Sequence, residues 1–144
     1  MIGIETPVPD ELELFHRIPP NMIIWDLNEH RYRPTTGLFR KKERVSIYLA
    51  DKLVEESRQP VSVLATYPGH SLAASIARTV REECQEVVRS PRDDEPAHGD
   101  IVGKKPTTRA ERIALAASWE FVDDEAIPEK EKAREAADPD APPR

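Results

Sequence analysis

The residues best suited to chemistry are a cluster of cations and hydroxyls before the middle of the chain. Guanidinium and ammonium groups bind phosphates and carboxylates, and the interleaved Tyr32 and Phe39 can stack on a flat ligand. Thr35 and Thr36 add hydroxyls directly after a proline. The cluster therefore predicts a binding surface, made of Arg31, Arg33, Thr35, Thr36, Arg40, Lys41, Lys42 and Arg44.

The distribution of charge favours a protein as the partner of this surface. The chain has a net charge of −6, of which residues 1–29 carry −5, residues 30–118 carry +4 and residues 119–144 carry −5. A mildly basic middle between acidic ends suits docking to a protein. A nucleic-acid-binding module using residues 31–44 is an alternative, but the overall acidity opposes it. The acidic ends either fold back over the basic middle or keep the protein soluble, and we prefer the second interpretation.

Metal and phosphate-loop chemistry find little support. No two of the four histidines, His16, His30, His70 and His98, have zinc-ligand spacing, and Cys84 is the only cysteine. We therefore predict no metal site and no disulfide. With only five glycines, a loop that cradles phosphates is not expected. His98 precedes a predicted strand in a polar loop, where binding residues often lie, although bonding to backbone carbonyls is its preferred role.

Apolar patterning predicts the elements that must position these residues. Alternation and β-branched residues predict strands at residues 12–18, 22–25, 45–49, 61–65, 86–89 and 100–104, with a short helix as the alternative for the first. A helix is predicted at 50–58, with Leu53 and Val54 facing inward. A second is predicted at 71–84, where Leu72, Ile76 and Val80 recur every four residues.

A third helix is predicted at 108–119, where Thr108 and Glu111 have the spacing of a capping box. Strands followed by strand–helix alternation predict a single α+β domain, with a small mixed β-sheet packed by two or three helices.

Composition marks the ends of this domain. Residues 1–10 predict a flexible N-terminal arm, residues 11–122 the α+β domain, and residues 123–144 an acidic, Pro/Ala-rich disordered tail. No apolar run has the length of a signal peptide or a membrane span. We therefore expect a cytoplasmic protein without a membrane partner.

Three motifs together resemble a family of small, uncharacterised bacterial proteins. They are residues 33–39 (Arg-Pro-Thr-Thr-Gly-Leu-Phe), 45–47 (Val-Ser-Ile) and 96–105 (Pro-Ala-His-Gly-Asp-Ile-Val-Gly-Lys-Lys). The resemblance spans roughly residues 14–119, and Thr36 stands where serine would be expected. It implies a compact bacterial cytoplasmic protein and carries over no activity, cofactor or site residue.

A looser resemblance in layout is to ADP-ribosyltransferase-like domains, which use NAD. It would place His16 or Arg17, Ser46 and Tyr48 around a nicotinamide, with His98 as a further candidate. No residue is convincing as the catalytic glutamate, because Glu95 precedes its strand.

These observations favour a non-catalytic accessory or adaptor protein that binds a protein partner in a bacterial multi-protein system and needs no cofactor. The alternatives are an enzyme that uses or hydrolyses NAD and the nucleic-acid-binding module. Convergence of Arg33, Ser46 and His98 on one cleft would favour the enzyme.

Overall fold

The structure is a computed structural model. It describes residues 6–36, 44–83, 85–103, 114–116, 118–123 and 127–142. The predicted capping box, Cys84, and the binding-surface residues Arg40, Lys41 and Lys42 lie outside these residues.

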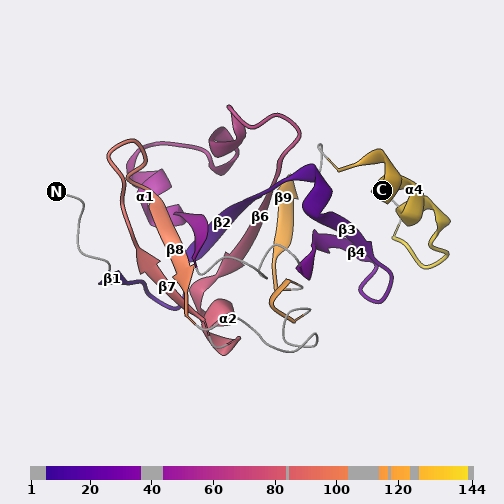
Figure 1. The fold of residues 1–144 in the computed structure, drawn as a ribbon, viewed down its shortest axis with the longest axis horizontal. Helices are drawn as coiled ribbons and strands as arrows, with labels where there is room; N and C mark the ends of the chain where they lie inside the picture. Colours follow the sequence, from indigo (N-terminus) through magenta and orange to yellow (C-terminus); the bar gives the residue numbers. More distant parts are fainter. Residues whose placement is uncertain are drawn as a thin grey trace.

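A seven-stranded sheet forms the body of the protein (Figure 1). Its spatial order is β1-β7-β8-β5-β2-β6-β9, and every pair is antiparallel. The strands are β1 Thr6–Pro7, β2 Glu13–Ile18, β5 Val45–Leu49, β6 Ser71–Ile76, β7 Glu86–Arg89, β8 His98–Val102 and β9 Glu120–Asp123.

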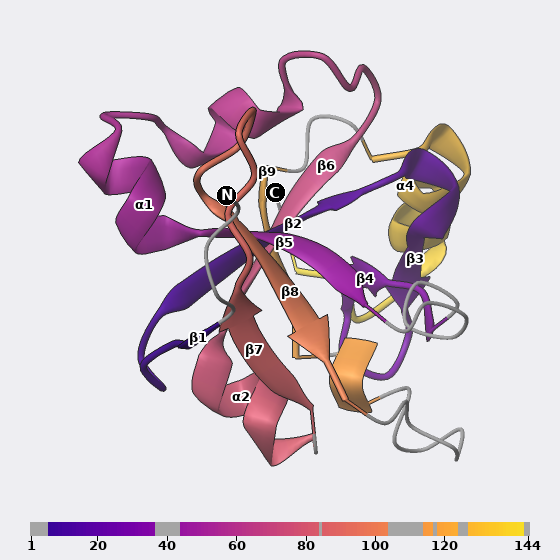
Figure 2. The same cartoon turned by 60° about the vertical axis from the view of Figure 1, so that its left-hand side comes forward.

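Beside one edge of this sheet lies a hairpin of β3 Ile23–Asp26 and β4 Arg31–Pro34, with helix α4 packed against it (Figures 1 and 2). The described helices are α1 Ala50–Glu55, α2 Ala77–Glu82 and α4 Glu129–Ala137, with 3-10 turns at η1 Pro20–Met22 and η3 Pro60–Leu64. The predicted α+β class and single domain are confirmed, with a sheet that is antiparallel in its described pairs rather than mixed.

Strand alternation separates two buried faces of the sheet. On one face, Leu14 of β2 lies opposite Leu49 of β5, and both belong to the larger core with Trp119. On the other face, Phe15 packs with Leu53 of α1 and with Val63 and Leu72. Because consecutive strand residues point to opposite faces, β2 contributes side chains to both cores.

The predicted helix at residues 71–84 is wrong in its first half, which is strand β6. This strand pairs along its whole length with β2, from Ser71 opposite Ile18 to Ile76 opposite Glu13. Its alanines and serines have no strong hydrophobic period, so the long-range partner decides the conformation. The helix starts only at Ala77.

Two further local predictions are wrong. The predicted strand at residues 61–65 is instead the 3-10 turn Pro60–Leu64 with its C-cap Ala65, since the backbone hydrogen bonds stay local, as from Ser62 N to Gln59 O. In α1, Leu53 is buried as predicted, but Val54 is 76% exposed. The helix ends at Glu55, so it is too short to need a wide apolar face.

The ends of the chain are more ordered than predicted within the described residues. In the predicted flexible arm, Thr6 and Pro7 pair with β7, and Val8 is buried. In the predicted disordered tail, residues 129–137 form α4. Composition alone did not reveal this helix because the groups that hold it lie more than a hundred residues earlier in the chain.

A substitution at Gly99 of β8 would test how closely the central strands are packed. A Cβ at this position would lie 2.9 Å from Leu49 Cδ2 and 3.0 Å from the carbonyl oxygen of Val88. Gly99→Ala should therefore lower the free energy of unfolding by about 1–3 kcal/mol, because overpacking displaces the backbone. Urea denaturation measures this, with the exposed Ser46→Ala as a control expected to change stability by less than about 0.5 kcal/mol. Equal stabilities for the two variants would contradict the packing described.

Candidate functional site at the hairpin

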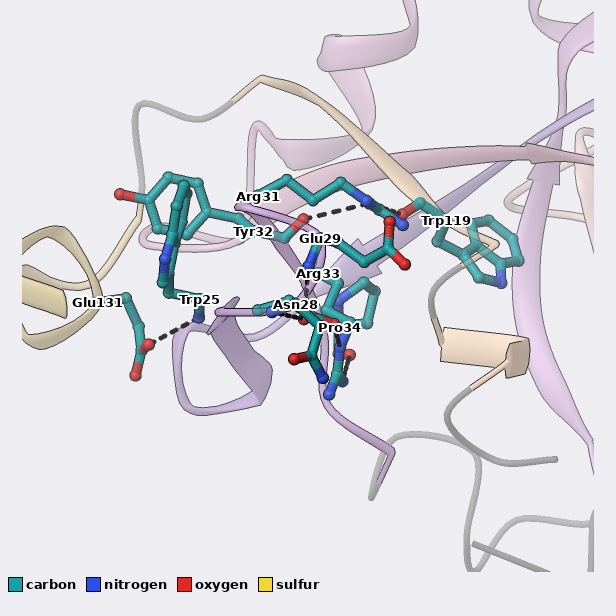
Figure 3. Close-up of polar contacts among 10 residues, drawn as sticks. Trp25, Asn28, Glu29, Arg31, Tyr32, Arg33, Pro34, Trp119 and Glu131 are labelled. Carbon is teal, nitrogen blue, oxygen red and sulfur yellow. Dashed lines mark hydrogen bonds and ion pairs between the residues drawn. The ribbon is translucent and has the colours of Figure 1, made fainter. Parts of the chain in front are cut away.

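The carboxylate of Asp26 builds the turn of the hairpin. Its Oδ1 accepts hydrogen bonds from the backbone N–H groups of Asn28 (2.9 Å) and Glu29 (3.0 Å), and its Oδ2 accepts one from Arg33 Nε (2.7 Å). Burial raises the pKa of Asp26, but the Arg33 guanidinium and the two amides outweigh it and leave the pKa below its usual value. His30 closes the turn with φ of 53°. Figure 3 shows this turn and its neighbours.

Two aromatic residues form the platform of the hairpin. Trp25 and Tyr32 are opposite one another in the two strands, and their rings meet edge to face with centroids 4.9 Å apart. Both side chains are buried. The pair presents the indole N–H, the phenol O–H and the Trp25 backbone N–H toward the C-terminal segment.

Acidic side chains of the C-terminal segment occupy these donors. Glu131 Oε2 accepts the Trp25 backbone N–H at 2.8 Å, and Asp138 Oδ2 accepts the Trp25 indole N–H at 3.0 Å (Figure 3 shows the first). The Tyr32 hydroxyl donates to Glu135. Glu131, Glu135 and Asp138 recur at the i, i+4, i+7 spacing of one helix face. The helix is therefore held by its carboxylates, as α4 itself contains no apolar side chain larger than alanine.

His30 completes this attachment. Its Nδ1 lies 2.8 Å from Asp138 Oδ2, and the Asp138 side chain is only 3% exposed. The hydrogen bond with Asp138 raises the pKa of His30. The same bond, with contributions from the Asp140 amide and Trp25, keeps the pKa of Asp138 below its usual value although burial opposes the shift.

An open groove of about 580 Å³ runs between the hairpin and α4. Leu27 on its rim is 65% exposed, and the Arg134 side chain is 57% exposed. Arg33, by contrast, is 13% exposed and paired with Asp26. The groove is lined by Ile24, Trp25, Asp26, Leu27, Asn28, Arg33, Arg134 and Ala137.

The described residues of the predicted binding surface mostly contact their own chain. Arg31 donates to the carbonyl oxygen of Trp119 at 2.9 Å (Figure 3), and Arg44 pairs with Asp100 at 3.0 Å. Thr35 Oγ1 donates to Met22 Sδ, and Thr36 is half-buried. Arg33 is the residue of this described set that lines the groove. A binding role for the set stays a prediction.

The residues predicted for an NAD-using enzyme divide between the two faces of the sheet. Tyr48 lies opposite both Phe15 and His98, and Ser46 lies opposite Asp100, so these side chains share one face with Arg17. His16 points to the other face, against Trp119 with ring centroids 5.9 Å apart. Arg33 lies on the separate hairpin, so Arg33, Ser46 and His98 do not converge.

A buried Ser–His–Asp cluster was missed by sequence reasoning. Ser90 Oγ donates to Asp100 Oδ2 at 2.7 Å, and His98 Nδ1 lies 2.9 Å from the carbonyl oxygen of Ser90. Ser90 Oγ also lies 3.0 Å from His98 Nδ1, so the serine side chain contacts both the imidazole and the carboxylate. Its hydroxyl donates to Asp100, whereas the serine of a nucleophilic triad donates to the histidine. The cluster braces the adjoining ends of β7 and β8. Alternating polar residues in strand 98–102 were the only sequence signal for it.

The described residues contain neither a group of three or more metal-ligating side chains placed to hold an ion nor a helix long and apolar enough to cross a bilayer. Comparison with known proteins adds no assignment: no family model, curated protein or solved structure matches the chain.

The His30–Asp138 pair should make stability depend on pH. Since the pKa of His30 is raised from 6.5, its contribution is complete below that value and is lost as the pH rises through the folded-state pKa. Since the pKa of Asp138 is lowered from 3.8, its contribution holds above that value and is lost as the pH falls through the folded-state pKa. Asparagine tolerates the left-handed backbone of residue 30, so His30→Asn is a suitable variant. As the pH rises from 6 to 9, the free energy of unfolding should fall less in His30→Asn than in wild type. Parallel urea-denaturation profiles would contradict the coupling.

Two glutamates in the first turn of α4 give a matched test of the helix attachment. Glu131→Ala leaves the buried Trp25 N–H without its acceptor and should cost about 1–3 kcal/mol. Glu129 is 91% exposed, so Glu129→Ala should change stability by about 0.5 kcal/mol or less. Chemical denaturation measures both values. A larger loss for Glu129→Ala would show that α4 is held differently.

Proposed function

We propose that the protein is a non-catalytic adaptor whose groove between the hairpin and α4 binds an acidic segment of a protein partner carrying an apolar side chain. One observation carries this proposal: exposed Leu27 and exposed Arg134 stand on the rim of the same groove. A leucine contributes binding energy by burial, and an arginine adds a charge-assisted hydrogen bond to a carboxylate. Together they favour a ligand that pairs both features.

The state of the surrounding polar groups supports binding rather than catalysis. Asp26 already accepts three hydrogen bonds, and Glu131 and Asp138 are held by Trp25. A general acid or base needs a proton position that the substrate can reach. Here the carboxylates serve as structural acceptors. The apolar lining of the groove (Ile24, Trp25 and Leu27) and Arg134 are left for contact with a ligand.

Because the chain has a net charge of −6, it repels an acidic segment at long range. Recognition must therefore depend on contacts within the groove. Beyond roughly 8 Å, salt at physiological concentration screens most of the repulsion between the two molecules. Within the groove, Arg134 lies 3.4 Å from Glu131, a longer separation than a strong ion pair, so it keeps hydrogen-bonding capacity for a ligand. The expected affinity is therefore moderate and depends on both rim residues.

The alternatives make different predictions. An enzyme acting on NAD would release nicotinamide on incubation, and the release would fall in Arg17→Ala and Ser46→Ala. A nucleic-acid-binding module would show an affinity that falls steeply with salt. The described arginines at 31, 33 and 44 bind carbonyl or carboxylate oxygens of the chain itself, which does not favour the second alternative.

Peptide display against the immobilised full chain tests the proposal. Selected peptides should combine Asp or Glu with Leu, Ile or Phe. Fluorescence anisotropy with one such peptide should show about tenfold weaker binding, about 1.4 kcal/mol, for Leu27→Ser and for Arg134→Gln. Lys130→Gln, an exposed α4 position that does not line the groove, is the matched control and should bind normally. Basic consensus peptides, or equal binding by all variants, would overturn the proposal.

A further inference from the structure

A second feature, outside the groove, is the way that Arg17 is held on the face of the sheet that carries Tyr48. Its guanidinium carbon lies 3.4 Å from the centroid of the Tyr67 ring, and its Nε donates to the Tyr48 hydroxyl at 2.9 Å. The residue is half-buried. Stacking and this single hydrogen bond orient the guanidinium and leave its two terminal amino groups in a defined direction.

The pairing of Arg17 differs from that of comparable arginines. The other described half-buried arginines contact a carboxylate or a carbonyl oxygen of the chain: Arg31, Arg33, Arg58, Arg81 and Arg89. Within the described residues Arg17 has neither, although the chain contains 27 Asp and Glu residues. A pairing with the chain's own carboxylates is the default here, so its absence at a pre-oriented cation needs an explanation.

We infer that Arg17 is the anchor of an oxyanion-binding site for a small molecule that bears a phosphoryl or carboxylate group. The two terminal amino groups of a guanidinium match two oxygens of such a group in a bidentate contact. Partial burial strengthens this contact relative to one in bulk water. Because Tyr67 already holds the plane of the guanidinium, little side-chain entropy is lost when the anion binds.

The surroundings place the site at the border of the sheet face. Tyr67 is 37% exposed, and His70 meets its ring edge-on with centroids 5.6 Å apart. Gly69, with φ of +81°, makes the turn between them. Figure 2 shows β2, β5 and β8 side by side, so the exposed Ser46 and half-buried Tyr48 of β5 lie on the same face as the anchor. A ligand larger than a simple anion has hydroxyl groups within this face to contact.

Calorimetric titration of the full chain in chloride-free buffer, with inorganic phosphate and with succinate, tests the inference. Wild type should bind one of the two, and the preferred anion identifies the group. Arg17→Gln should weaken binding at least tenfold, and Arg17→Lys should weaken it severalfold, because the charge remains but the planar fork is lost. Arg92→Gln removes an exposed arginine elsewhere and should bind like wild type.

Variants of Tyr67 keep the test decisive if the Arg17 variants fold poorly. Tyr67→Phe retains the ring under the guanidinium and should bind within twofold of wild type. Tyr67→Leu removes the ring and should weaken binding about fivefold or more, in line with the energy of an aromatic–cation contact. Absence of binding to either anion, or unchanged binding in both Arg17→Gln and Tyr67→Leu, would overturn the inference.

Discussion

The hydrogen bonds of Trp25 are the central attachment of the C-terminal segment to the hairpin, and this attachment forms the candidate site. The backbone N–H of Trp25 reaches Glu131, which is 106 positions away, and its indole N–H reaches Asp138, which is 113 positions away. A nine-residue helix is marginal in isolation. Buried carboxylates that lost these donors would carry a large desolvation cost, so the helix is stable in this position and in few others.

The ion pairs, too, join residues that are far apart in the sequence. Asp10 and Glu11, near the acidic N-terminal end, pair with Arg81 and Arg78 of the basic middle. At the other end, Asp138 pairs with His30. The acidic ends therefore do fold back on the middle at several points, the interpretation that sequence reasoning ranked second. Exposed pairs contribute little energy each, whereas the buried Asp138 contact also orients a helix.

The two proposed sites are formed by side chains that the internal charge pairing does not engage. Around the hairpin most polar groups are engaged, and an exposed leucine and an exposed arginine remain beside the groove. On the sheet face, Arg17 is oriented by two tyrosines instead of a carboxylate. One proposed site suits a protein segment and the other a small anion, and each can be tested without the other.

Local patterns were sufficient where a strand or turn carries its own signal. Residues 45–49 alternate β-branched and aromatic residues and form β5, and the strands at β2, β3 and β7 lie close to their predicted positions. The polar residues 26–30 form a turn because Asp26 accepts hydrogen bonds from the backbone of its own neighbours. In the turn the partners of the deciding hydrogen bonds lie within three residues of Asp26, and in the strands the alternation that predicts them involves only neighbouring residues.

The sequence by itself determined the α+β class and the turns, because alternation and short-range hydrogen bonds depend on neighbouring residues. Only the tertiary structure decided that residues 71–76 are a strand and that an acidic segment is a docked helix. It also decided that, within the part of the chain that the structure describes, Arg33 pairs with a carboxylate and Arg17 does not. Those outcomes depend on partners distant in the chain. The free energy of burying or pairing a polar group is set by whichever residues the fold brings beside it.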